Sequence, residues 1–285
     1  MEPSLDRRRF ASLIGLSPLA GAITPFLVLG DALAQPAHEK RIGDDAAHNK
    51  LAAVPDLKMM GSEQIAMLLY PGFTALDLVG PHYMFASMMG AKVHLVTTGA
   101  DLAPVPSDLG LAIAPTMRMQ DCPADLDILF CPGGLAGTLE AMKNAAIIDF
   151  IADRGSRAKN ITSVCTGSLL LGQAGLLRGK RATSHWAAIN TLDAFGAVPT
   201  HERVVIDGKV ITGAGVSAGL DFGLQLIARL RGVNYAKAIQ LQAEYAPEPP
   251  FDAGTLKTAP PAVADAMSTM LAPFETMVRT AARPR

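Results

Sequence analysis

Apolar runs alternate along the chain with segments in which apolar residues recur every three or four positions. Four runs are typical of strands in a covered sheet: residues 65–70, 92–97, 126–131 and 160–163. Four periodic segments predict helices: residues 76–89, 138–156, 217–231 and 234–243, the last capped by Asn234. Because strands alternate with helices, the pattern predicts an α/β fold whose mostly parallel sheet has helices on both faces.

The segments between and after these elements predict hairpins, a short strand and one more helix. Residues 105–118 are expected to form a hairpin around Ser107-Asp108, and residues 202–212 one with Asp207-Gly208 as its two-residue turn. Residues 181–184 predict a short strand. After Pro260 an apolar stripe predicts a last helix that packs on the domain or on a second subunit: Val263, Met267, Met270, Leu271, Phe274 and Val278.

Cys165 lies between a predicted strand and a predicted helix, within Val164-Cys165-Thr166-Gly167-Ser168. This is the arrangement of a nucleophile elbow, with cysteine in place of serine. The N-terminus of the following helix favours a thiolate, which is the nucleophilic form of the side chain. A buried cysteine often only fills space. Small residues after the sulfur leave room for a substrate, so Cys165 is predicted to be a catalytic nucleophile.

Other chemical features lie at the carboxyl ends of predicted strands, where parallel sheets bind their ligands. Asp77 follows the first strand and could cap the next helix; alternatively, its carboxyl group could reach the sulfur and exchange a proton with it. Gly133 and Gly134 offer backbone N–H groups that, with the N–H of Thr166, could hold a developing negative charge; the alternative is that they simply form a tight turn. His185 is a candidate supporting residue, although a single histidine is more often structural.

The composition narrows the possible functional classes of the protein. The chain has 285 residues, 49% of them hydrophobic, and a formal net charge of −1, which gives no electrostatic basis for nucleic-acid binding. Its three cysteines cannot all pair, and whether Cys122 bonds to Cys131 stays open. No Cys/His spacing predicts a metal site.

The N-terminus has the pattern of a twin-arginine export signal. Arg7-Arg8-Arg9 precedes a weakly apolar run, and small residues favour cleavage after Ala34. We therefore predict a signal peptide over residues 1–34 and a periplasmic location without stable membrane insertion; an uncleaved membrane anchor is the alternative. Residues 35–62 are expected to be a flexible leader.

Five motifs together resemble the ThiJ/PfpI superfamily, which is related to the class I glutamine amidotransferases. They are Leu76-Asp77-Leu78-Val79-Gly80-Pro81, Cys131-Pro132-Gly133-Gly134, the elbow, the segment 179–186 and the segment 242–251. The resemblance implies a flavodoxin-like three-layer sandwich with a catalytic domain over residues 63–260, followed by a C-terminal helix over 261–285. It also implies a homodimer that acts on a small molecule without a cofactor.

Within the superfamily, the motifs look like those of isonitrile hydratases. That resemblance implies Cys165 as nucleophile, Asp77 as its carboxylate partner and Thr166 as a close polar neighbour. The expected reaction adds water to an isonitrile through a thioimidate and yields an N-substituted formamide. The alternatives are another cysteine enzyme of the superfamily, of the glyoxal-hydrating or amidase type, or a non-catalytic periplasmic thiol sensor or ligand-binding domain.

Overall fold

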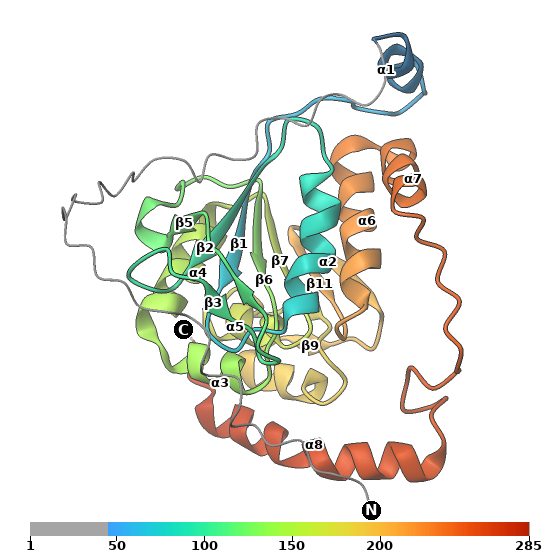
Figure 1. Cartoon of the computed structure of the whole chain (residues 1–285). Coiled ribbons are helices and arrows are strands. Elements are labelled where there is room, and N and C mark those ends of the chain that lie inside the picture. Colours follow the sequence, from blue (N-terminus) through green and yellow to red (C-terminus); the bar gives the residue numbers. More distant parts are fainter. Residues whose placement is uncertain (1–44, 285) are drawn as a thin grey trace, which may run out of the picture. The chain divides into compact units, whose positions relative to one another are not determined.

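The computed structural model describes residues 45–284, and its centre is a seven-stranded sheet (Figure 1). In spatial order the strands are β10 (Val204–Asp207), β11 (Val210–Gly213), β7 (Asn160–Val164), β6 (Ile128–Cys131), β1 (Gln64–Leu69), β2 (Lys92–Thr97) and β5 (Met117–Arg118). Every neighbouring pair is parallel except β10 with β11. The predicted mostly parallel α/β architecture is confirmed.

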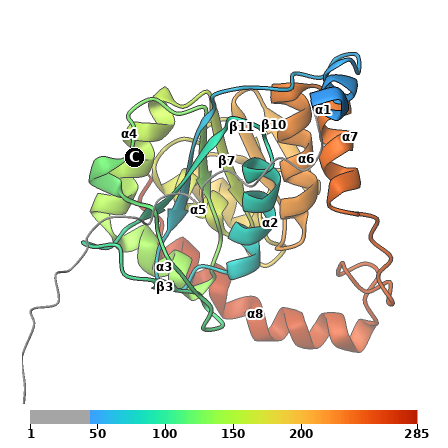
Figure 2. The ribbon, with the colours of Figure 1, turned by 45° about the horizontal axis from the view of Figure 1, so that its top comes forward.

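Helices cover both faces of this sheet (Figures 1 and 2). On one side lie α2 (Ala75–Ala86), α6 (Ala218–Arg231) and α7 (Val233–Gln242); on the other lie α3 (Ala136–Lys143), α4 (Ala145–Arg157) and α5 (Gly167–Gln173). The remaining elements are α1 (Asp45–Ala52), β3 (Val105–Pro106) with β4 (Ala112–Ile113), η1 (Met119–Asp121), β8 (Arg181–Ala182) with β9 (Val198–Pro199), η2 (Ile189–Phe195) and α8 (Pro261–Ala281).

The order of the strands decides which loops meet. β7, β6 and β1 are neighbours at the centre, with Cys131 paired to Ser163 and Met67 paired to Phe130. All three run in the same direction, so their carboxyl ends lie at one edge. This places the segments after Leu69, Cys131 and Val164 side by side, as the sequence predicted.

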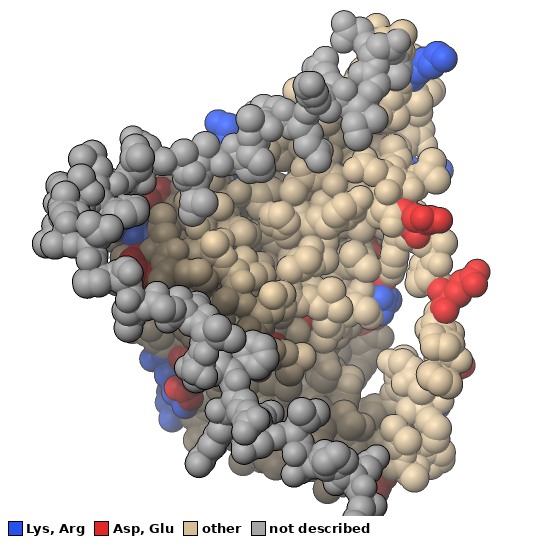
Figure 3. Space-filling model, in the orientation of Figure 1, with Lys and Arg blue, Asp and Glu red and all other residues tan. Residues whose placement is uncertain are grey.

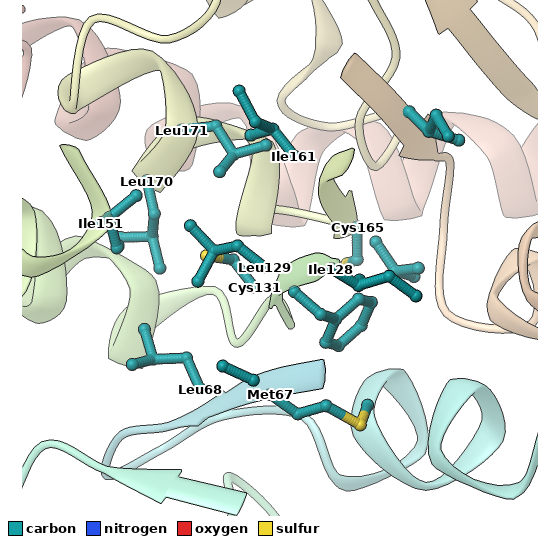
Figure 4. Packing of buried hydrophobic residues seen from close by; sticks show 14 of the residues in the cluster. Met67, Leu68, Ile128, Leu129, Cys131, Ile151, Ile161, Cys165, Leu170 and Leu171 are labelled. Atoms are coloured by element: carbon teal, nitrogen blue, oxygen red, sulfur yellow. The ribbon is translucent and has the colours of Figure 1, made fainter. Parts of the chain in front are cut away.

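The core fills the space between the sheet and its helices. Figure 4 shows Cys131 and Cys165 among apolar side chains of β1, β6, β7, α4 and α5. On the α2 and α6 side, the Phe130 ring lies 6.3 Å from that of Phe85 and 5.8 Å from that of Phe222. Edge-on and tilted aromatic pairs at such distances add stabilisation beyond the area that they bury.

Several local predictions need correction. The segment expected to be one helix breaks at Asn144, whose side chain accepts hydrogen bonds from the N–H groups of Ala146 and Ile147 and so starts α4. Residues 117–118 leave the expected hairpin and pair with β2. Since Asp207 pairs with Val210, the turn is Gly208-Lys209. The amide of Asn234 donates to the Pro55 carbonyl instead of capping α7.

The end of the expected flexible leader is fixed to the domain. Arg231, at the end of α6, donates to the carbonyls of Lys58 and Met59, and the Gly61 N–H donates to the Met89 carbonyl. A polar segment can thus be ordered by one buried cation that its composition does not reveal. The predicted signal peptide, residues 1–34, lies outside the described residues.

The last helix is only half covered. Phe274 and Val278 are buried, and α8 contacts α3 and η2, whereas Val263, Met267 and Met270 are exposed. The predicted stripe therefore packs on the domain only in its C-terminal half. Among residues 45–284, no helix is both long and apolar enough to cross a membrane.

Candidate active site

Cys165 occupies the sharp turn between β7 and α5, with a φ of 58°. Such a backbone costs about 1–3 kcal/mol in a residue other than glycine and must be held by its surroundings. The Cys165 N–H donates to the carbonyls of Gly213 and Ala214, and the Ser184 hydroxyl donates to the Cys165 carbonyl at 3.0 Å. A Cβ at Gly167 would lie 2.1 Å from the Cys131 carbonyl oxygen, so only glycine fits there. The predicted nucleophile elbow is present.

Asp77 lies in the first turn of α2 and is fully buried. Its Oδ2 accepts the Gly133 N–H at 2.9 Å. Among the described residues, no N–H or O–H group donates to its Oδ1. Burial raises the pKa of Asp77 to about 7, against the opposing hydrogen bonds from Gly133 and from the Cys165 thiol. The carboxyl group therefore pairs with the sulfur and titrates near neutral pH, where it can both accept and donate a proton.

The thiol responds to the same burial. Only 3% of the Cys165 surface is exposed. Burial raises the pKa of the Cys165 thiol well above its usual range, and the neighbouring Asp77 charge raises it further; the Thr166 N–H and hydroxyl act in the opposite direction. Burial of the sulfur opposes ionisation of the Cys165 thiol, whereas the Thr166 N–H at the start of the short helix α5 favours it. The thiol thus lies beside a carboxyl group whose pKa is about 7.

Gly133 and Gly134 hold the side chains of Asp77 and Thr166 in place. The Gly133 N–H donates to Asp77, and the Gly134 N–H donates to the Thr166 hydroxyl oxygen at 3.0 Å. Both donors expected to stabilise a developing oxyanion are therefore already engaged. A Cβ at Gly133 would lie 2.7 Å from both Asp77 Oδ2 and Thr166 Oγ1. Any residue larger than glycine would therefore collide with both side chains.

Thr166 belongs to a buried group of hydroxyls that sequence reasoning missed. Its Oγ1 lies 2.9 Å from the Thr138 Oγ1, which lies 3.0 Å from the Tyr70 hydroxyl. The Tyr70 hydroxyl donates to the Pro132 carbonyl at 2.8 Å. Tyr70 follows β1 and Thr138 lies on α3, and nothing in their local sequence distinguishes them from ordinary core residues.

His185 lies near this centre without a hydrogen bond, among the described residues, to Cys165 or Asp77. It is half-buried, burial lowers its pKa, and its Nδ1 accepts the Ala187 N–H. Its ring contacts the backbone beside Gly215. The contact to the elbow comes instead from the preceding residue, Ser184.

All three cysteines are free, so the Cys122–Cys131 bridge is not formed. Burial raises the pKa of both of these thiols, which lie in the core. Within the described residues, no group of three or more His, Cys, Asp or Glu side chains could hold a metal ion.

A cavity of about 530 Å³ lies beside the site. Its lining includes Tyr70, Pro71, Gly137 and Glu140, together with residues 97–99 and 103–106. Neither Cys165 nor Asp77 lines it. Tyr70 both lines the cavity and contributes its hydroxyl to the buried group around Thr166.

Comparisons with known proteins agree with this fold. Isonitrile hydratase of Pseudomonas putida is 50% identical over 210 residues, which span 74% of this chain and 90% of that protein. A solved ThiJ/PfpI family protein of Pseudomonas syringae shares 53% identity at a TM-score of 0.80, covering 86% of this chain and 98% of the other.

A second kind of relative is a regulator. The HTH-type transcriptional regulator CdhR of Pseudomonas aeruginosa is 30% identical over 188 residues, which span 64% of this chain and 54% of the regulator. The sequence profile of the DJ-1/PfpI family matches residues 63–229, which include the elbow, Asp77 and both glycines. This chain belongs to the DJ-1/PfpI family.

Proposed function

We propose that this protein is an isonitrile hydratase that converts R–N≡C and water into an N-substituted formamide. The observation that carries the proposal is the buried pairing of the Cys165 thiol with a carboxyl group, Asp77, whose pKa is about 7. The 50% identity to isonitrile hydratase of Pseudomonas putida supports the same activity. The reaction needs one nucleophile and one proton carrier, and the site supplies both.

The first step joins sulfur and hydrogen to the same carbon. As the Cys165 sulfur attacks the terminal carbon of the isonitrile, the Asp77 carboxylate takes the thiol proton. Asp77 then delivers this proton to the attacked carbon, which gives the thioimidate R–N=CH–S–Cys165. The carboxylate is regenerated, and no charge is left on the adduct.

The second step is hydrolysis of the thioimidate. Asp77 accepts a proton from water as the water oxygen adds to the carbon and passes this proton to the nitrogen, which gives R–NH–CH(OH)–S–Cys165 and regenerates the carboxylate. Collapse of this adduct forms the C=O bond, breaks the C–S bond and returns a proton to the sulfur. The product is R–NH–CHO, and Cys165 is a thiol again.

Two features favour this reaction over amide or peptide hydrolysis. Acyl transfer needs free donors for an oxyanion, but the N–H groups of Gly133 and Gly134 are engaged by Asp77 and Thr166. The first addition to an isonitrile places the new electron pair on carbon, where a proton quenches it. A 3% exposed cysteine also suits the slender linear end of an isonitrile.

Burial of Cys165 argues against a thiol sensor in two ways. Sensor cysteines have a low pKa and are accessible to solvent, whereas burial raises the pKa of Cys165 and covers its surface. The likeness to a transcriptional regulator reflects the shared domain, over about half of the regulator's length.

Purified protein is expected to convert an alkyl isonitrile to its formamide, and Cys165→Ala is expected to abolish turnover. Cys122→Ala is the matched control, since Cys122 is also a buried free thiol but follows η1, away from the elbow. Full turnover by Cys165→Ala would refute the mechanism. If the wild-type protein turns over glyoxals but no isonitrile, the activity is glyoxal hydration instead.

The rate of hydration is expected to fall as the medium becomes acidic. Because the pKa of Asp77 is about 7, protonation below that pH removes the base that takes the thiol proton. The kcat/KM should decrease about tenfold per pH unit on the acid side. Rates measured with Cys165→Ala give the spontaneous acid hydrolysis to be subtracted. A corrected profile that stays flat through neutral pH would contradict the role given to Asp77.

Assembly and location are separate predictions. Leu76, Val79 and Tyr83 expose apolar side chains on α2, the helix that carries Asp77, and uncharged residues dominate the visible surface there (Figure 3). A homodimer would have an apolar surface to bury on this side. Export to the periplasm depends on the signal at residues 1–34, and fractionation of cells that express the whole chain would test it.

A further inference from the structure

The hydroxyls of Tyr70, Thr138 and Thr166 form a continuous chain that ends beside the catalytic sulfur. All three side chains are at most 1% exposed, so their hydroxyls are shielded from bulk solvent. This chain of hydrogen bonds begins at the Pro132 carbonyl, 2.8 Å from the Tyr70 hydroxyl. The Tyr70 hydroxyl lies 3.0 Å from that of Thr138, which lies 2.9 Å from that of Thr166. Each hydroxyl has one proton, so each can donate only once.

This limit fixes the direction of the chain at rest. A carbonyl oxygen only accepts, so the Tyr70 hydroxyl donates to Pro132. The contact between Tyr70 and Thr138 is then a hydrogen bond only if Thr138 donates. Thr166 must in turn donate to Thr138, while its oxygen accepts the Gly134 N–H. In this order the Thr166 proton points away from the site.

The three hydroxyls can also donate in the opposite direction. If Tyr70 donates to Thr138 and Thr138 donates to Thr166, the Thr166 proton is released toward the Cys165 sulfur. The Thr166 hydroxyl does interact with this sulfur and lowers the pKa of its thiol. The reversed order leaves the Pro132 carbonyl without its donor. A neutral sulfur does not compensate for that loss, whereas a negative sulfur attracts the proton strongly.

We propose that Tyr70 and Thr138 are positioning residues that let the Thr166 hydroxyl turn toward Cys165 when negative charge develops on the sulfur and turn back when the charge is gone. Only hydroxyl rotations are needed, and no proton is gained or lost. In the reaction proposed above, sulfur carries such charge twice, as it attacks the isonitrile carbon and as it leaves the tetrahedral adduct. The role in turnover rests on that proposed function; the effect on the thiol does not.

Other ionisable groups near the sulfur do not duplicate this function. Asp77, on α2, is an acceptor when it is charged, and its charge opposes ionisation of the thiol. Cys131, at the end of β6, is a thiol whose pKa burial raises further. Asp108 acts on Asp77 and raises its pKa. The Thr166 hydroxyl and N–H are the groups that favour a thiolate.

The test measures the apparent pKa of the Cys165 thiol from the pH dependence of its alkylation by iodoacetamide, followed by peptide mass spectrometry. Tyr70→Phe removes the acceptor of the Thr138 proton, and Thr138→Val removes the acceptor of the Thr166 proton. Both substitutions free the Thr166 hydroxyl for the sulfur, so each is expected to lower the thiol pKa by about one. Thr166→Val removes the donor and is expected to raise it.

Matched controls separate this effect from packing. Thr138→Ser keeps the hydroxyl and should keep the wild-type thiol pKa. Thr162→Val removes another fully buried hydroxyl, one that donates to the Leu129 carbonyl, and should leave the thiol pKa unchanged. If Thr138→Val does not fold, Tyr70→Phe, which keeps the ring, carries the test.

Two outcomes would overturn the inference: unchanged thiol pKa values in Tyr70→Phe and Thr138→Val, or values that rise as in Thr166→Val. Alkylation needs no isonitrile, so the result stands even if the protein hydrates another substrate. If hydration is observed, Tyr70→Phe should change kcat while the KM for the isonitrile stays the same.

Discussion

Asp77→Asn is expected to eliminate most isonitrile hydration while it makes the folded protein more stable above neutral pH. The amide keeps the size of the side chain, and its oxygen can still accept the Gly133 N–H. It cannot carry a proton from sulfur to carbon, so kcat should fall by about 10²–10⁴-fold. The lost function and the gained stability have the same cause, which is a carboxyl group kept where its charge is disfavoured.

The stability effect has a defined pH window. Burial raises the pKa of Asp77 from 3.8 to about 7, so the folded state binds this proton more tightly than the unfolded state. The stabilisation from that proton is complete below about 3.8 and is lost as the pH rises through about 7. The free energy of unfolding of Asp77→Asn relative to wild type should therefore grow between these values, by on the order of 4 kcal/mol.

Urea unfolding on the acid and the alkaline side of this window, together with the hydration assay, measures both effects. Asp265→Asn, at an exposed position on α8, is the control and should change neither. A variant that loses activity but has the same pH dependence of stability as wild type would show that Asp77 is not the group with the raised pKa. A variant that keeps its activity would remove Asp77 from the mechanism.

Arg231→Met is expected to destabilise the fold by about 3–5 kcal/mol, the largest stability effect of a single substitution that we predict. Arg231 is fully buried and forms a two-pronged ion pair with Glu63. It also donates to the carbonyls of Lys58, Met59 and Met89 and lies over the Tyr235 ring, 5.5 Å from its centre. The substitution leaves the buried Glu63 carboxylate and the carbonyls of Lys58 and Met59 without this donor, and the Met89 carbonyl keeps only the Gly61 N–H.

An exposed ion pair provides the comparison. Arg181 and Glu202 are 2.7 Å apart and about half exposed, so Arg181→Met should cost about 0–1 kcal/mol. Both variants are compared with wild type by urea unfolding. Similar losses in the two variants would show that Arg231 contributes no more than a surface charge. Glu63→Gln should also destabilise, because it leaves the guanidinium buried without a negative partner.

Arg231 also shows a limit of the sequence pattern. Residues 55–62 were expected to be flexible, yet they are tied to a cation about 170 positions away, with separations of 173 and 172 to Lys58 and Met59. Nothing near Lys58 indicates this partner. The helix break at Asn144 could have been predicted from the local sequence, since asparagine is a common helix N-cap.

The sequence by itself determined the parallel α/β order, the elbow at Cys165 and the edge at which the site forms. These follow from apolar periodicity and from residues adjacent in the chain, where the backbone responds to local preference. Only the tertiary structure decided the chemical state of the site. Asp77 meets Gly133 across 56 positions and Tyr70 meets Thr138 across 68. The pKa of each group depends on such distant neighbours and on the removal of water, and neither is encoded in any single segment.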